Sequence, residues 1–201
     1  METTIELLQP IAGESAMGEP KDQYRIQPVD PEDVTDKTRH LLEQVQAKVG
    51  LVPNLFRVLA NAPAALEGYL NFDGALAGGT LNDKIREQLA LAVAESNLCD
   101  YCLSAHAFLG QRVGLTPEEI ENAIRSCAAD PKTDAILKLA RAIIVQRGEI
   151  SDSDLRSARA AGLSDGEIIE TAANVALNIF MNYMSHAARL PIDFPQDDFD
   201  I

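Results

Sequence analysis

Runs of apolar residues at helical spacing, each closed by glycine or proline, recur along most of this chain. The first run, from Thr35 to Val49, places its leucines and valines on one helical face, and Gly50 and Pro53 then end the helix. No stretch alternates apolar and polar residues for the length of a β-strand. Aromatic residues, on which sheets draw heavily, are only 5% of the total. We therefore predict an all-α protein.

Local start and stop signals place the other helices. They are predicted over about residues 54–59, 64–76, 83–95, 99–112, 132–146 and 167–188, with one more beginning after Thr116. Twice, glycine ends a helix and a hydroxyl residue caps the next: Gly114 precedes Thr116, and Gly162 precedes Ser164. The residues Ser96-Asn97 either separate two helices or kink a single one, and the sequence leaves both readings open.

Residues 1–34 differ from the rest of the chain, because they carry six prolines and glycines and show no clear period. We predict an irregular N-terminal arm over residues 1–34 and one helical domain over residues 35–201. A weak internal repeat is also visible, since Glu87 and His106 are separated by the same interval as Glu167 and His186. This spacing raises the hypothesis of an internal helical duplication with chemistry in only one copy.

The chain is strongly acidic, with a formal net charge of −14. Such a surface repels phosphate backbones and anionic membranes, so neither nucleic acid nor membrane is expected as a partner. No N-terminal segment resembles a signal peptide, and no apolar run reaches the roughly 18 residues of a membrane span. We therefore expect a cytoplasmic protein, in which a close pair of cysteines is more often catalytic or metal-binding than structural.

Such a pair is present at Cys99 and Cys102, followed by His106. Positions i, i+3 and i+7 share one helical face, so these three side chains would point the same way. At the start of a helix, unpaired backbone N–H groups stabilise a thiolate, and the second thiol can then close a disulfide. The imidazole of His106 could accept or return the thiol proton near neutral pH. This pattern favours thiol redox chemistry.

Three other readings of the cysteine pair compete with this one. Two small buried side chains on a core helix would give the same pattern. A zinc site would have only three ligands, since Cys127 is distant in sequence and no second pair exists, so no metal is expected. A thioredoxin-type site would need a preceding β-strand, and none is predicted.

The carboxylate that would handle protons beside the thiols has two candidates. On an unbroken helix Glu95 shares the face of the cysteine pair, whereas Glu87 is rotated away. A break at Ser96-Asn97 removes that argument and lets Glu87 reach the thiols.

The stretch from Leu81 to His106 resembles the core of the alkylhydroperoxidase D (AhpD) and carboxymuconolactone decarboxylase superfamily. The family pattern is a glutamate, a Cys-x-x-Cys pair and a histidine at fixed intervals. The matching positions here are Glu87, Cys99, Cys102 and His106. Upstream, the segment Gly50-Leu51-Val52-Pro53-Asn54-Leu55-Phe56 is similar to the branch called peroxidase-related enzymes. The likeness covers about residues 49–123, with the redox core at about residues 80–123.

This resemblance implies an all-helical, AhpD-like domain that assembles as a homo-oligomer, a trimer or a hexamer. It also implies reduction of hydroperoxides through a dithiol–disulfide cycle with no bound cofactor. In that scheme Cys102 resembles the peroxidatic cysteine, and Cys99 resolves its sulfenic acid into a disulfide. Glu87 and His106 resemble the proton relay, which favours Glu87 over Glu95. By analogy the reductant is an external dithiol such as a dihydrolipoyl protein.

One residue departs from the family pattern. In the best-studied branch a histidine of the relay stands just before the second cysteine, where this chain has Tyr101. A phenol has a pKa near 10 and shuttles protons poorly at neutral pH, although it can donate a hydrogen bond. We therefore expect weaker peroxidase activity or a different substrate.

Two functions of other classes stand beside the hydroperoxide reductase. One is a decarboxylase-like lyase on the same fold, whose members are expected to lack the cysteine pair. The other is a non-enzymatic redox sensor or scaffold whose Cys99–Cys102 disulfide changes assembly or partner choice. Among the remaining polar residues, His186 is expected in the core or in a subunit interface, and Cys127 has no assigned role.

Overall fold

Nine α-helices and no β-strand make up the part of the chain that the structure describes, residues 24–194 of a computed structural model. The prediction of an all-α protein is confirmed. In chain order the helices are α1 (Asp36–Val49), α2 (Asn54–Leu59), α3 (Pro63–Ala77), α4 (Asp83–Ser96), α5 (Asp100–Arg112), α6 (Pro117–Ile124), α7 (Pro131–Val145), α8 (Asp152–Ala160) and α9 (Asp165–Ala188). Within residues 24–194, no helix is long and apolar enough to cross a membrane.

The helix starts predicted at Thr116 and Ser164 are confirmed. Each hydroxyl oxygen accepts a hydrogen bond from the backbone N–H of a glutamate three residues on. That glutamate's carboxylate in turn accepts one from the backbone N–H of the capping residue. Gly114 and Gly162 precede these caps in the left-handed conformation, with φ of 87° and 90°. The two connections therefore form as their sequences specify.

No sequence prediction covered α8. This helix has nine residues and buries only Ala158, so it carries no apolar period that could reveal it. Its signal is the capping box at its start, where Ser151 accepts from the backbone N–H of Asp154 and the Asp154 carboxylate accepts from the N–H of Ser151. The sequence pattern Ser-x-x-Asp could have identified it.

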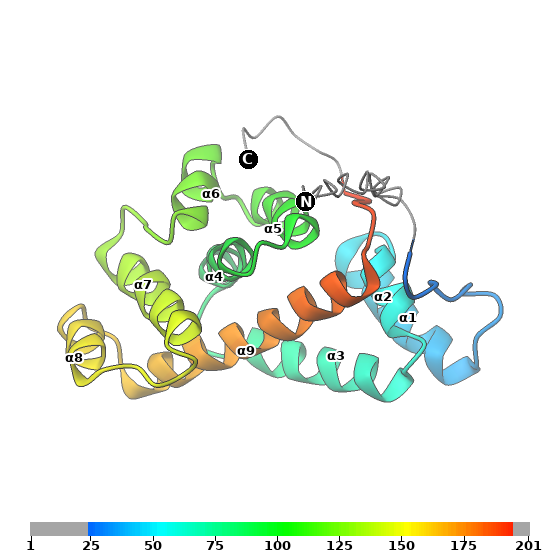
Figure 1. The fold of residues 1–201 in the computed structure, drawn as a ribbon, viewed down its shortest axis with the longest axis horizontal. Coiled ribbons are helices and arrows are strands. Elements are labelled where there is room, and N and C mark those ends of the chain that lie inside the picture. Colours follow the sequence, from blue (N-terminus) through cyan, green and yellow to red (C-terminus); the bar gives the residue numbers. More distant parts are fainter. Residues whose placement is uncertain (1–23, 195–201) are drawn as a thin grey trace, which may run out of the picture.

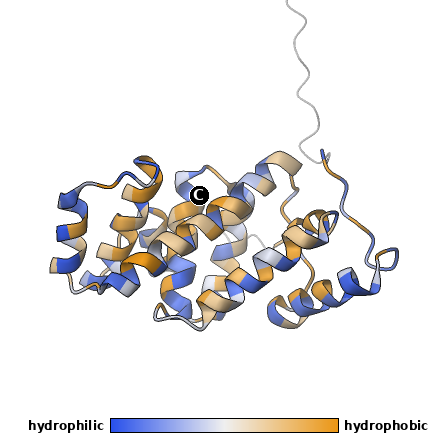
Figure 2. Ribbon diagram, turned by 90° about the horizontal axis from the view of Figure 1, so that it is seen from below, coloured by the Kyte–Doolittle hydropathy of each residue, from blue (hydrophilic) through white to orange (hydrophobic). Residues whose placement is uncertain are grey.

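The core is built around α4, which packs against α5, α6, α7 and α9. The residues from Leu89 to Ala94 are all buried, so α4 presents no side chain to solvent over more than one turn. The 24-residue α9 crosses the middle of the molecule, with α1 to α3 toward one end and α7 and α8 at the other (Figure 1). Figure 2 shows hydrophobic residues gathered along the middle and hydrophilic ones toward the two ends.

Glu170 of α9 fixes the connection that starts α4. Its carboxylate accepts hydrogen bonds from the backbone N–H groups of Thr80 and Leu81 at 2.8 and 3.1 Å. Asn82 then caps the helix, because its side-chain oxygen accepts from the N–H of Ile85 at 3.0 Å. These bonds fix where α4 begins and hence which of its residues face α5.

The predicted arm over residues 1–34 falls largely outside the described residues, which begin at Tyr24. Residues 24–34 contain no helix. The backbone N–H of Val29 donates to the carbonyl of Arg57 at 3.1 Å, and that of Arg25 donates to the carbonyl of Ala188 at 2.9 Å. This segment therefore lies against α2 and the end of α9.

The helices do not support an internal duplication. Glu87 and His106 lie on α4 and α5, two helices that pack against each other. Glu167 and His186 lie near opposite ends of the single helix α9, roughly 28 Å apart at 1.5 Å per residue. Residues 167–186 form one continuous helix, whereas the chain reverses direction between Glu87 and His106. The equal spacing of the two Glu–His pairs therefore does not reflect equal structure.

Replacing Leu89 by alanine is expected to lower the free energy of unfolding by about 3 kcal/mol, because the side chain is fully buried and its removal leaves a cavity. Chemical denaturation followed by circular dichroism measures the change. The matched control is Val145→Ala: Val145 is 70% exposed, so its truncation should change the unfolding free energy by less than about 0.5 kcal/mol. Equal losses in the two variants would contradict the central position of α4.

Candidate active site

A tight reversal at Leu98 joins α4 to α5. Leu98 is left-handed, with φ of 55°. Its N–H donates to the carbonyl of Glu95 at 3.0 Å, and the N–H of Cys99 donates to the carbonyl of Ala94 at 2.9 Å. This pair of bonds is a Schellman motif, a common way for a helix to end on a left-handed residue. Of the two readings of Ser96-Asn97, the break is therefore the one that the structure adopts.

The reversal is held from α9. The side-chain amide of Asn97 donates to Oδ1 of Asn182 at 2.9 Å, and Nε2 of His186 donates to the carbonyl of Asn97 at 2.9 Å. One hypothesis placed His186 in the core of the protein. Its side chain instead lies at the exposed surface. Both contacts tie the turn before the cysteines to α9.

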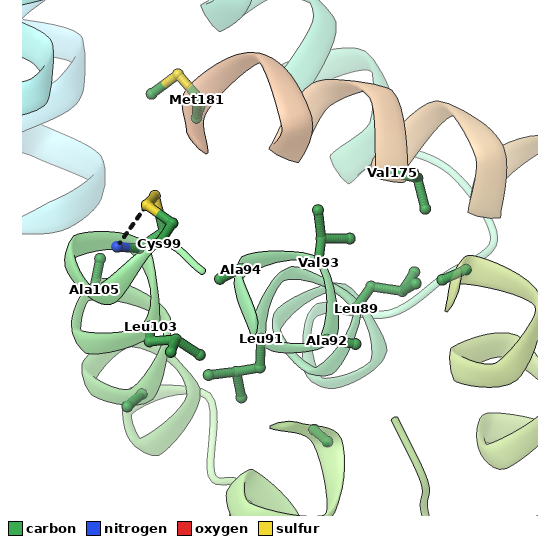
Figure 3. Packing of buried hydrophobic residues seen from close by; sticks show 14 of the residues in the cluster. Leu89, Leu91, Ala92, Val93, Ala94, Cys99, Leu103, Ala105, Val175 and Met181 are labelled. Atoms are coloured by element: carbon green, nitrogen blue, oxygen red, sulfur yellow. Dashed lines mark hydrogen bonds between the residues drawn. A yellow bond between two sulfur atoms is a disulfide. The ribbon is translucent and has the colours of Figure 1, made fainter. Parts of the chain in front are cut away.

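Cys99 is the N-cap residue of α5, and Cys102 lies in the first turn of that helix. The two form a disulfide. Sγ of Cys99 accepts a hydrogen bond from the backbone N–H of Cys102 at 3.3 Å, drawn as the dashed line in Figure 3. Both residues are buried, with exposed fractions of 1% and 3%. The pair thus lies at a helix start, where unpaired N–H groups stabilise a thiolate once the disulfide is reduced.

Glu87 on α4 meets His106 on α5. Oε2 of Glu87 lies 2.8 Å from Nδ1 of His106, and each side chain is 20% exposed. A carboxylate in this position accepts the Nδ1 proton and leaves Nε2 as the proton acceptor of the ring. His106 follows Cys102 by one helical turn, so the base and the thiol share one side of α5.

Glu95, the other candidate carboxylate, takes no part in this arrangement. It lies in the last turn of α4 and does not line the pocket that contains Glu87 and His106. The case for Glu95 required an unbroken helix, and the reversal at Leu98 removes that condition.

A pocket of about 120 Å³ opens beside the cysteine pair. Its walls are mostly apolar and come from six helices and from the chain beyond α9; they include Val45, Phe56, Leu70, Leu109, Met181 and Phe194. Figure 3 shows Met181 on α9 across from Cys99 at the start of α5. Cys102 lines the pocket together with Glu87 and His106, whereas Cys99 does not. A small molecule in this pocket therefore reaches Cys102 first.

One side of the pocket carries charge. The carboxylate of Asp73 accepts from Arg86 at 2.7 Å and also pairs with Lys48. Arg86 is mostly buried, and its Nε donates to Oδ1 of Asn174 at 3.4 Å. Sequence reasoning missed this network, because the residues of each bonded pair are 13 to 88 positions apart and the network spans four helices. No local spacing could reveal it.

Tyr101, which departs from the family pattern, is buried and joins α5 to α2. Its hydroxyl oxygen accepts a hydrogen bond from the backbone N–H of Leu55 at 3.3 Å, and its ring packs edge-on against Phe194. Burial, and next the negative charge of Asp193, raise the pKa of Tyr101 well above its ordinary value of 10.0. The phenol therefore stays neutral and cannot act as a general base at physiological pH.

Cys127, the third cysteine, lies beyond the end of α6 and is a free thiol. Its Sγ donates to the carbonyl of Asn122 at 3.3 Å. Over residues 24–194, the structure places no group of three or more histidine, cysteine or carboxylate side chains so that they could hold a metal ion.

Residues 63–144 match the sequence model of the Carboxymuconolactone decarboxylase family. The matched segment runs from α3 to α7 and contains Glu87, the cysteine pair and His106. A search of curated proteins by sequence gives no match.

Solved structures share the fold over most of this chain. An uncharacterized peroxidase-related protein from Ralstonia eutropha, described as an alkylhydroperoxidase AhpD core, has a TM-score of 0.77 and 24% identity, covering 87% of this chain and 93% of its own. A peroxidase-related protein from a Silicibacter species has a TM-score of 0.74 and 24% identity, with coverage of 87% and 95%. A debrominase, solved as a cysteine-to-alanine variant in complex with 2,3,4-tribromopyrrole, has a TM-score of 0.73 and 16% identity, with coverage of 84% and 91%. These likenesses establish the AhpD-like fold.

Alkaline pH is expected to destabilise the protein partly through Tyr101. The unfolded chain releases the phenol proton near pH 10, whereas the folded chain retains it because burial raises the pKa. The free energy of unfolding should therefore fall above about pH 10, by up to about 1.4 kcal/mol per pH unit for this group. Denaturation of wild type and Tyr101→Phe between about pH 9 and pH 11 measures the slope, which the variant should reduce.

Tyr183→Phe is the control for this titration, since the Tyr183 ring is 61% exposed. Its slope should match that of the wild type. A slope in Tyr101→Phe that also matched the wild type would show that the phenol ionises normally in the folded protein.

Proposed function

We propose that this chain is a thiol-dependent hydroperoxide reductase, because residues 63–144 match the Carboxymuconolactone decarboxylase family and the fold is AhpD-like. Its redox-active group is the dithiol of Cys99 and Cys102, and the chemistry needs no bound cofactor. The observation that carries this proposal is the unequal placement of the two cysteines. Cys102 lines the pocket beside Glu87 and His106, whereas Cys99 lies outside it at the helix cap.

In the first half-reaction the Cys102 thiolate attacks the terminal oxygen of a hydroperoxide. A sulfur–oxygen bond forms and the oxygen–oxygen bond breaks, so the sulfur is oxidised to a sulfenic acid and the peroxide is reduced to an alcohol. His106 takes the proton of the thiol before the attack and returns it to the leaving alkoxide. Glu87, at 2.8 Å from Nδ1, stabilises the protonated ring between these two events.

In the second half-reaction the thiol of Cys99 attacks the sulfenic sulfur of Cys102. Water leaves, and the disulfide present in this structure forms. An external dithiol then reduces the disulfide by thiol exchange and is itself oxidised. By analogy with the family, we propose a dihydrolipoyl protein as the reductant, the cytoplasm as the location, and a trimeric or hexameric homo-oligomer as the working assembly.

Functions of other classes make different predictions. A decarboxylase-like lyase would not need the sulfurs, so turnover of a lactone acid by the Cys99→Ser, Cys102→Ser double variant would support it. A redox sensor would change its oligomer size between oxidising and reducing conditions without turning over peroxide. The debrominase that shares the fold is a reason to include a halogenated aromatic compound among the substrates tested.

Cys102→Ser is expected to abolish hydroperoxide turnover with a dithiol reductant, because the attacking sulfur is lost. Cys99→Ser should still undergo the first oxidation but form no disulfide, so one equivalent of peroxide leaves Cys102 as a sulfenic acid. Mass spectrometry of the thiols after a stoichiometric pulse of peroxide, with a sulfenic-acid trap present, measures both outcomes. Cys127→Ser is the control and should keep full turnover. Turnover that survived in Cys102→Ser would refute the proposal.

Glu87→Gln is expected to lower kcat/KM for the hydroperoxide about 100-fold, because a neutral amide does not stabilise the protonated ring of His106. Stopped-flow measurement of peroxide consumption gives the value. Glu95→Gln makes the same chemical change on the same helix but outside the pocket, and should leave kcat/KM unchanged. If the two variants lost activity equally, the assignment of the relay to Glu87 would be wrong.

A further inference from the structure

Beyond α9 the chain turns back toward the site. Arg189 ends α9 in the left-handed conformation. The carbonyl of Pro191 then accepts from the side-chain amide of Asn54 at 3.5 Å, and Oδ2 of Asp193 accepts from the backbone N–H of Asn54 at 2.6 Å. The second bond is charge-assisted and hence among the stronger kind. Residues Pro191–Phe194, called the C-terminal segment below, are thus attached to the start of α2.

The anchor at Asp193 places the next residue, Phe194, against the first turns of α5. The Phe194 ring is buried, with 7% exposed. Its centroid lies 5.7 Å from that of Tyr101 in an edge-on contact and 5.9 Å from that of Phe108. Phe194 lines the same pocket as Cys102. A residue from the far end of the sequence therefore forms part of the wall that a substrate of Cys102 would meet.

We propose that Phe194 is a specificity-determining residue, which contacts the organic group of the hydroperoxide and so selects apolar aryl or branched alkyl hydroperoxides over hydrogen peroxide. This inference rests on the proposed hydroperoxide reduction. Phe56, Leu70 and Met181 also line the pocket, so an apolar group held there is removed from water on several sides. Hydrogen peroxide has no such group and gains nothing from these walls.

Asp193 is the positioning residue for this contact. It does not line the pocket itself. It holds the segment through Asn54, and its charge also lies close to the hydroxyl of Tyr101. Loss of the carboxylate should therefore loosen the Phe194 wall while leaving the sulfur, Glu87 and His106 in place. This loss should change kcat/KM according to the organic group of the substrate and should not alter the reaction at the peroxide bond.

The test compares kcat/KM for cumene hydroperoxide and for hydrogen peroxide, using the full chain and a dithiol reductant. Phe194→Ala is expected to lower kcat/KM for cumene hydroperoxide about tenfold, chiefly through KM, because the contact with the phenyl group is lost. The value for hydrogen peroxide should fall much less, so that the ratio of the two kcat/KM values changes, and circular dichroism checks that the variant is folded. Phe194→Leu keeps an apolar wall and should retain most of the selectivity.

Ile192→Ala is the matched control. It removes another apolar side chain from the same segment, but Ile192 is 36% exposed and lies outside the pocket. Its selectivity should equal that of the wild type. Asp193→Ala keeps the ring but removes the anchor, and should lower the ratio of the two kcat/KM values as Phe194→Ala does. Asp193→Asn keeps an oxygen that accepts from Asn54 and should preserve most of the ratio.

A measurement without turnover separates this inference from the proposed function. Calorimetric titration with 2-phenyl-2-propanol, the alcohol formed from cumene hydroperoxide, should give a Kd about tenfold weaker for Phe194→Ala than for the wild type. An unchanged selectivity and an unchanged Kd would overturn the role of Phe194 while hydroperoxide reduction stands. A wild-type protein that reduces neither peroxide would overturn the proposed function.

Discussion

Two backbone hydrogen bonds at the end of α4, donated by Leu98 and Cys99, turn the chain back on itself. Along one unbroken helix Glu87 and His106 would lie roughly 28 Å apart, whereas across the reversal their side chains meet at 2.8 Å. The left-handed conformation of Leu98 costs roughly 1–2 kcal/mol, and the bond from Asn97 to α9 helps to offset that cost. The reversal therefore brings Glu87 and His106 together beside the cysteine pair.

Most of the fold could be predicted because local sequence signals mark its helices. Caps such as Thr116 and Ser164 and runs of buried apolar residues mark where helices begin and continue. The break between α4 and α5 could not be decided in this way. Left-handed positions at helix ends are usually glycine, and Leu98 gives no such sign. The choice between Glu87 and Glu95 depended on that break. Residue spacing alone favoured Glu95, whereas the family resemblance favoured Glu87, which is the carboxylate that meets His106.

The parts of the site that no spacing revealed are those that other helices and the C-terminal segment bring to it. Asp73 and Arg86 form an ion pair between α3 and α4, and Phe194 arrives from beyond α9. No local sequence pattern predicts such residues, because their role depends on contacts between segments that are distant in the sequence. The chemistry proposed for the pocket could be predicted from Cys102 and His106, but the shape of the pocket could not.

The capping atom of α5 is Sγ of Cys99, which accepts a hydrogen bond from the N–H of Cys102 and which the proposed cycle oxidises and reduces. Whenever Cys99 is released as a thiolate in that cycle, its full negative charge accepts such a bond more strongly than a disulfide sulfur does. The start of α5 consequently stabilises the reduced pair more than the oxidised one, which makes the disulfide a stronger electron acceptor. By thermodynamic linkage, reduction must stabilise the helix to the same extent that the helix favours reduction. Part of the free energy that stabilises α5 therefore also favours reduction of the disulfide.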